Sequence, residues 1–118
     1  MNSVDFIVGD KTYRLSLTTR GIVQLERKLG YNPIMMFVSN INSEISDDDV
    51  RIPTTSEMAT VLHLAMQRFN HGITAESVYD IIDDYIAMGN TTIDLVPIIV
   101  DLFKNSGIMP KDDDEKNA

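Results

Sequence analysis

The spacing of apolar residues changes once along the chain, near residue 17. Before that point, residues 4–8 and 12–17 are rich in β-branched and aromatic side chains, and apolar and polar residues alternate from residue 13 onward. A period of two is typical of a strand with one buried face. Gly9-Asp10-Lys11 lies between the two runs and predicts a turn. The pattern therefore predicts a β-hairpin over residues 4–17, which must pack on the rest of the chain because an isolated hairpin is marginal in water.

After residue 17 the apolar residues recur every three or four positions, which predicts five short helices. Each predicted helix has a start or stop signal of known type, either a capping side chain or a glycine after the last turn. These signals are Thr18 or Thr19 and Gly30 for the first helix, Asn32-Pro33 for the second, the capping-box pair Thr54 and Glu57 for the third, Thr74 for the fourth, and Thr91 or Thr92 and Gly107 for the fifth. The stretch 39–53 has no sustained period and predicts a long loop.

Together these elements predict an α+β, mostly α fold, in which an N-terminal β-hairpin is followed by about five short helices in a compact bundle. Residues 1–107 are expected to form a single domain, because no linker or internal repeat interrupts them. Residues 108–118 are expected to form a flexible, disordered acidic tail, since they end in a charged run without core-forming residues.

Composition narrows the possible functions. The chain of 118 residues has no cysteine, which excludes disulfides and thiolate chemistry. Neither a signal peptide nor a membrane-spanning segment is predicted. The net charge is −8, distributed as about +2 over residues 1–40 and −10 over residues 41–118. A surface of that sign repels phosphate, so we expect no nucleic acid partner.

Candidate chemistry is sparse. Asp80 and Asp84 lie four residues apart on one predicted helix face and could hold a divalent cation, but no further ligand motif accompanies them. A solvated acidic face explains the same pattern. The two histidines, His63 and His71, have no zinc-type spacing and no partner for nucleophilic catalysis. We therefore expect no cofactor, no metal, no catalytic residue and no enzymatic activity.

An apolar surplus after the first helix is more informative. Five consecutive apolar residues, which a small core cannot bury completely, predict a partner-binding patch. They are Ile34, Met35, Met36, Phe37 and Val38. Methionine suits such a patch because its flexible thioether adapts to varied partners.

A resemblance to a known family accompanies this segment. A short hairpin, a helix ending in Leu25-Glu26-x-Lys28-Leu29-Gly30, and then Asn32-Pro33 with an apolar run resembles the tail assembly chaperones of long-tailed (siphovirus-type) bacteriophages and prophages. The resemblance follows the order of elements from about residue 6 to residue 103.

The resemblance implies a non-enzymatic protein that binds the phage tape measure protein and keeps it soluble during tail tube assembly. The major tail tube protein and a second copy of the chain are further possible partners. The implied location is the bacterial host cytoplasm, with the protein absent from the mature virion. In that family a longer form commonly arises by programmed frameshifting, and codons for Lys116-Asn117 could form a slippery pair.

Two alternatives remain open. A small phage structural or connector protein, at the joint of head and tail, would have a similar size and composition. A divalent-metal-binding enzyme built on Asp80 and Asp84 is the third reading.

Overall fold

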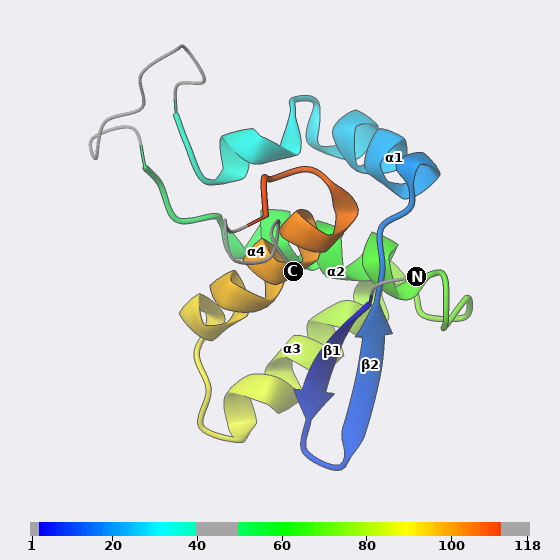
Figure 1. Ribbon diagram of the computed structural model, residues 1–118. Coiled ribbons are helices and arrows are strands. Elements are labelled where there is room, and N and C mark those ends of the chain that lie inside the picture. Colours follow the sequence, from blue (N-terminus) through cyan, green and yellow to red (C-terminus); the bar gives the residue numbers. More distant parts are fainter. Residues whose placement is uncertain (1–2, 40–49, 112–118) are drawn as a thin grey trace.

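The computed structural model describes residues 3–39 and 50–111 of the chain (Figure 1). In chain order the elements are β1 (Val4–Val8), β2 (Lys11–Leu15), α1 (Thr19–Leu29), the one-turn 3-10 helix η1 (Pro33–Met36), α2 (Thr55–Met66), α3 (Ala75–Ala87), the 3-10 turn η3 (Thr92–Asp94) and α4 (Leu95–Ser106). The predicted order, a hairpin followed by helices in a mostly helical fold, is confirmed.

Helix α2 is the centre of the molecule, because it packs against α1, α3, α4 and strand β2. Eight of its twelve residues are buried, which is why its apolar side chains do not keep to one narrow stripe. In Figure 1, α1 and the turn of the hairpin lie at opposite ends of the molecule, with α2 and α4 between them. The core is one continuous apolar cluster to which the hairpin and the helices α1–α4 all contribute.

The hairpin packs on the helices as its alternation predicts. The strands are antiparallel, with Val4 opposite Leu15 and Val8 opposite Lys11. Phe6 and Leu15 on the inner face are fully buried. Where β2 ends, the backbone N–H of Ser16 donates a 3.0 Å hydrogen bond to the carbonyl of Ala65 near the end of α2. That carbonyl is one of the last four in its helix, which have no intrahelical partner.

The capping signals in the sequence lie where the helices begin and end. The hydroxyls of Thr18, Thr54 and Thr74 each accept a backbone N–H of the first helical turn. The capping box of Thr54 and Glu57 is complete in both directions. The glycines after α1 and α4 both have positive φ, which ends these helices in the left-handed conformation.

The structure departs from the sequence pattern in three places. The second predicted helix is only the single turn η1. The apolar spacing of the third predicted helix continues to Phe69, and that of the fourth continues to Ile86. Helix α2 nevertheless ends at Met66, and both Phe69 and Ile86 are partly exposed. The fifth predicted helix opens with the turn η3, and α4 begins at Leu95, so Pro97 lies in its first turn, where its missing N–H removes no helical hydrogen bond.

The packed part of the chain extends beyond the predicted boundary at residue 107. Ile108 and Met109 pack against the core, and both of their N–H groups donate to the carbonyl of Phe103. The remainder of the predicted acidic tail, with Lys116-Asn117, lies outside the described residues, as do residues 40–49 of the predicted loop. Among the described residues no single helix is long and apolar enough to cross a membrane.

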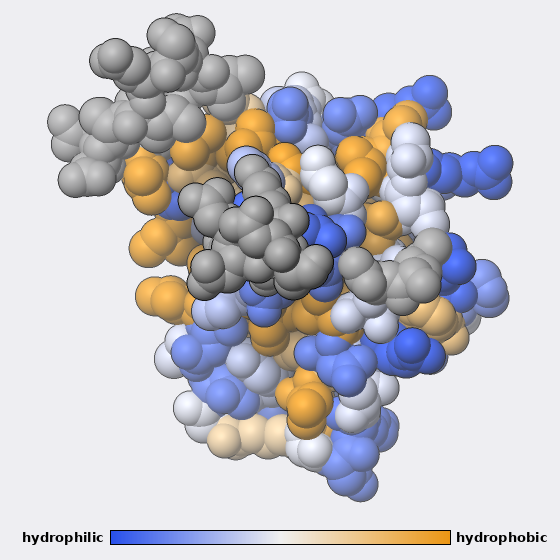
Figure 2. Space-filling view, viewed as in Figure 1, coloured by the Kyte–Doolittle hydropathy of each residue, from blue (hydrophilic) through white to orange (hydrophobic). Residues whose placement is uncertain are grey.

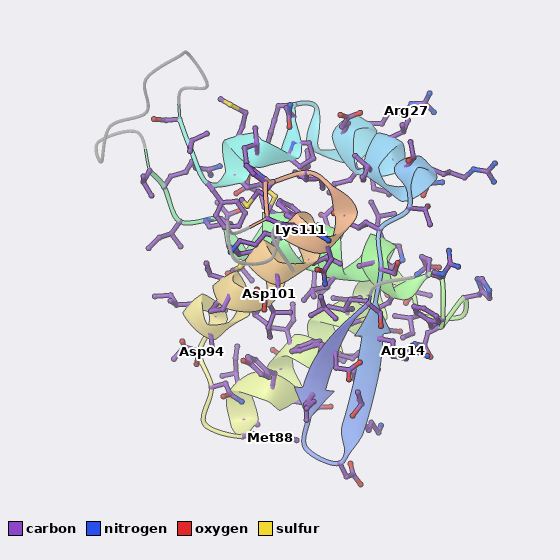
Figure 3. The ribbon with its side chains drawn as sticks, viewed as in Figure 1. Arg14, Arg27, Met88, Asp94, Asp101 and Lys111 are labelled. Atoms are coloured by element: carbon purple, nitrogen blue, oxygen red, sulfur yellow. The ribbon has the colours of Figure 1, made fainter. Side chains whose placement is uncertain are left out.

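The hairpin turn gives a first testable prediction. Gly9 has a φ of 64°, and a Cβ atom built there would lie 2.6 Å from Cε of Met88, which Figure 3 shows beside the turn. We expect Gly9→Ala to lower the free energy of unfolding by about 1–2 kcal/mol from backbone strain, plus a smaller amount from this contact. Urea denaturation measures the loss.

Gly30→Ala is the matched control, because Gly30 also has positive φ but a Cβ there meets nothing within 4 Å. Gly9→Ala should be the more damaging of the two, and combining it with Met88→Ala should bring it to the level of Gly30→Ala. Equal losses in the two single variants would contradict the role of Met88.

Candidate partner-binding surface

The apolar segment 34–38 is held by a cap, a proline and one turn of 3-10 helix. The side-chain Oδ1 of Asn32 accepts the N–H of Ile34 at 3.1 Å, and Pro33 occupies the first position of η1. Proline favours this position because its φ is already helical. The turn ends at Phe37, whose N–H donates to the carbonyl of Ile34 at 3.0 Å. A tight turn spreads consecutive side chains in several directions, so the five apolar residues cannot share one face.

The structure accordingly separates the five predicted contact residues. Met36 is fully buried in the core, so it is unavailable to a partner and the prediction is wrong for this residue. Phe37 is half-buried, and its ring packs edge-on against Phe103 with centroids 5.7 Å apart. Ile34, Met35 and Val38 are half-buried and stay candidates for contact.

A second segment joins this one and enlarges the apolar surface. Val38 and Val50 form an antiparallel bridge, and the N–H of Arg51 donates to the carbonyl of Phe37 at 2.8 Å. Val50 and Ile52, which flank Arg51 in the sequence, are 61% and 63% exposed. We name the apolar patch by its four residues, Met35, Val38, Val50 and Ile52.

The patch adjoins a shallow hollow of about 400 Å³, lined by Met35 and Val38 together with Tyr31, Ser39, Arg51 and Glu57. Figure 2 shows hydrophobic side chains gathered along the left edge of the molecule, where Figure 1 places the segment that leads into α2 and the beginning of α4. Ile93, just before α4, is also well exposed. The lining of the hollow thus combines apolar side chains with charged and polar ones.

The charged residues of the hollow belong to a hydrogen-bonded network of four residues, Tyr31, Arg51, Thr54 and Glu57, which we call the Glu57 network. Oε1 of Glu57 accepts from Nη2 of Arg51 at 3.0 Å and from the N–H of Thr54 at 2.8 Å. Oε2 accepts from Nη1 of Arg51 at 3.1 Å and from the hydroxyl of Tyr31. All the acceptor positions of the carboxylate are in use, so it serves to position other groups and not to take up a proton.

The network also fixes the backbone beneath the patch. Nη1 of Arg51 donates to the carbonyl of Met35 at 2.7 Å, which connects η1 to the segment before α2. The N–H of Thr54 begins α2, and Tyr31 follows α1 directly. Glu57 and Arg51 therefore hold together three pieces of chain, two of which carry the patch, so the conformation of the patch is fixed within the folded chain.

Two pKa values reflect this arrangement. Burial acts to raise the pKa of Glu57, but hydrogen bonds from Arg51, Tyr31 and the N–H of Thr54 outweigh it and hold the pKa below its ordinary value of 4.5. The hydrogen bond to the Glu57 carboxylate raises the pKa of Tyr31 above its ordinary value of 10.0, and burial acts in the same direction. Both shifts favour the ionised glutamate and the neutral tyrosine.

The other candidate residues lie apart from this surface. Asp80 and Asp84 are exposed on α3, and within residues 3–39 and 50–111 no cluster of three metal-ligating side chains occurs. His63 lies half-buried on α2, and His71 is exposed in the turn after it. The divalent-metal reading therefore gains no support from the described part of the chain.

Sequence reasoning missed half of the patch. Val50 and Ile52 fall in the predicted loop of residues 39–53, although their alternation about Arg51 is the pattern of a short extended segment. The pairing of Arg51 with Glu57 could not be predicted from the sequence. The capping box identifies Glu57 as a helix-capping residue, but no local pattern shows that Arg51 and Tyr31 also donate hydrogen bonds to it.

Comparisons with known proteins supply a family but no activity. No curated protein and no solved structure matches the chain significantly. The model of one family, described as a family of unknown function (DUF6096), matches residues 3–118. Because this match spans nearly the whole chain, the protein belongs to the DUF6096 family.

Proposed function

We propose that this protein is a non-enzymatic tail assembly chaperone of a long-tailed bacteriophage or prophage. In the host cytoplasm it would bind the tape measure protein and keep it soluble while the tail tube assembles. The observation that carries the proposal is the apolar patch, which is exposed, rigidly supported and borders a hollow. We infer the particular client, the tape measure protein, from the order of elements along the chain, which resembles that of the chaperones.

The patch has the character expected of a surface that accepts apolar side chains from a client. It combines two aliphatic residues that are more than half exposed with a half-buried methionine beside a hollow. An amphipathic helix binds such a surface by inserting its apolar residues, spaced three or four apart. The hollow offers a place for one large apolar side chain of the client, and Met35 can adapt its shape to it.

The net charge of −8 fits a chaperone that must keep a coated client in solution. Exposed carboxylates on α3, at positions 80, 83 and 84, lie on an element separate from the patch. A complex that buries the patch therefore still presents a strongly acidic exterior, which opposes aggregation.

Co-expression tests the proposal directly. The protein is produced together with the long, helix-rich open reading frame encoded next to it, and the soluble fraction is separated by size-exclusion chromatography. We expect the neighbour to be soluble only in the presence of this protein and the two to co-elute. An insoluble neighbour, with this protein running alone or as a ring, would remove the chaperone and favour the connector.

A charge placed in the patch should abolish the complex without unfolding the protein. We expect Ile52→Asp to reduce the co-eluting complex at least 10-fold, because a carboxylate would be buried against an apolar client. Ile7→Asp is the matched control, since Ile7 is 62% exposed on the hairpin, almost the same fraction as Ile52. Equal effects of the two substitutions would show that the patch is not the binding surface.

A further inference from the structure

A second surface, on other elements, has the opposite charge. Three hollows of about 530, 260 and 50 Å³ lie along α1 and α2 and share lining residues, so they form one groove. Gln24, Leu64 and Gln67 line both larger hollows, and Lys28 and His63 line both the largest and the smallest. We call it the α1–α2 groove, and its basic residues are Arg20, Arg27, Lys28, His63, Arg68 and His71.

The cations of α1 lie on one side of the helix for a simple geometric reason. Residues 20, 24, 27 and 28 are spaced by four, seven and eight positions, so they share one face. Arg27 projects from α1 in Figure 3. Arg68 enters from the turn after α2, and its guanidinium carbon lies 5.7 Å from the centre of the Phe69 ring, a cation–π distance that steadies it.

The charge of the groove is uncompensated. No acidic residue lines any of the three hollows within the described ranges of the chain. Its four permanent cations form no ion pair with any other described residue. The salt bridge that the described residues do contain, between Arg51 and Glu57, lies outside the groove. The chain has eighteen acidic and ten basic residues, yet four of the ten basic residues and both histidines line this one groove. Charge of this sign attracts a ligand that carries carboxylates.

The shape of the groove favours a helical ligand. It lies between two helices, with the largely buried side chain of Leu64 in two of the hollows, and a third helix packs readily into such a space. Arg20 and Arg27 are two helical turns apart, about 11 Å along the axis. A docked helix presents carboxylates at the same spacing when they lie seven residues apart.

We propose that the α1–α2 groove binds an acidic, amphipathic helical segment of a partner protein. Its carboxylates pair with Arg20, Arg27, Lys28 and Arg68, and an apolar residue contacts Leu64. A nucleic acid is the less favoured polyanion, because a phosphate backbone offers no apolar side chain for the contact with Leu64. The inference does not rest on the proposed function, since the groove and the apolar patch share no residue.

The test uses the full chain and a labelled helical peptide of about 15 residues, roughly four turns. The peptide carries glutamates at four- and seven-residue spacing along one face and leucines along the adjoining face, so that both can reach the groove. A control peptide has glutamine in place of each glutamate. Fluorescence anisotropy should show binding of the glutamate peptide alone. The affinity should fall as the ionic strength rises above about 0.1 M, where screening shortens the range of surface charges.

Charge reversal locates the site. Arg20→Glu combined with Lys28→Glu should weaken binding at least 10-fold. Lys11→Glu with Lys111→Glu makes the same change in net charge at two exposed positions outside the groove and should leave the affinity within 2-fold. Circular dichroism checks that both double variants fold.

Three results would overturn the proposal. They are equal binding of the glutamine peptide, an equal loss in the Lys11 and Lys111 variant, and tighter binding of a single-stranded oligonucleotide that the groove variant abolishes. A groove that instead joins two copies of this chain would appear as a dimer in sedimentation, lost on the same charge reversal, and would equally exclude a separate partner. None of these results bears on Ile52 or the co-expression test.

Discussion

Replacing Glu57 by alanine is expected to lower the free energy of unfolding by about 2–4 kcal/mol. The substitution removes the acceptor for Arg51, Tyr31 and the N–H of Thr54 at once, and it deletes half of the capping box of α2. The loss of free energy exceeds the net contribution of the hydrogen bonds themselves, because donors that lose a largely buried acceptor are not fully rehydrated. Urea denaturation at neutral pH measures the loss.

Glu76→Ala is the matched control for this substitution. Glu76 is also an acidic residue in the first turn of a helix, α3, but it is exposed. It should therefore lose only the interaction with the helix dipole, about 0.3–1 kcal/mol. Similar losses at the two positions would mean that the Glu57 network does not stabilise the fold.

The same network makes the stability depend on pH. Because the folded state holds the pKa of Glu57 below 4.5, the unfolded state binds the proton first as the solution is acidified. The stabilisation is complete above the ordinary glutamate value and is lost as pH falls through the lower, folded-state pKa. The difference between the native chain and Glu57→Ala should narrow over that window and stay constant from about pH 6 to 8.

Tyr31 makes the stability depend on pH in the opposite direction, at alkaline pH. Its pKa is raised in the folded state, so its contribution is complete below 10.0 and is lost as pH rises through the folded-state value. Tyr31→Phe should remove this alkaline dependence. It should also weaken the acid dependence without abolishing it, because Arg51 and the N–H of Thr54 still hold the pKa of Glu57 down.

Met36→Ala is the second large effect, with an expected loss of about 2–5 kcal/mol in the free energy of unfolding. Met36 is fully enclosed by the core, and truncating it leaves a cavity that the surrounding side chains fill only partly. Loss of the co-eluting complex in this variant would follow from unfolding and not from a missing contact.

Met35→Ala separates stability from binding at the neighbouring position. Met35 is half-buried at the rim of the hollow, so its truncation should cost less than about 1 kcal/mol while weakening the complex with the client. Substitutions of two methionines adjacent in sequence should thus affect different measurements: one lowers the free energy of unfolding, and the other weakens the complex. A large loss of stability from Met35→Ala would place it in the core and remove it from the apolar patch.

Local sequence signals were sufficient to predict most of the fold. The alternation before residue 17 and the threonine caps at Thr18, Thr54 and Thr74 each act over a few residues, so the sequence displays them directly. Errors arose where packing decides. Phe69 and Ile86 continue a helical apolar period, yet both are exposed, because the period does not show where the neighbouring element stops.

The candidate surfaces depend on contacts between distant segments, and they were harder to predict. The run of apolar residues at 34–38 indicated a patch, but only the packing of η1 shows that Met36 belongs to the core. The α1–α2 groove was hidden for the same reason. The small positive charge of residues 1–40 was visible, whereas the approach of Arg68 and both histidines to α1 is tertiary.

The distribution of methionine has a consequence for oxidation. The chain has no cysteine, so thioethers are its readily oxidised sulfur groups. Met36, Met58 and Met66 are sealed in the core, whereas Met88 is 53% exposed and Met35 lines an open hollow. Mild peroxide would therefore convert Met88 and Met35 to polar sulfoxides before it reaches Met36, Met58 or Met66. Oxidative damage would then reach the turn of the hairpin and the apolar patch while the interior stays intact.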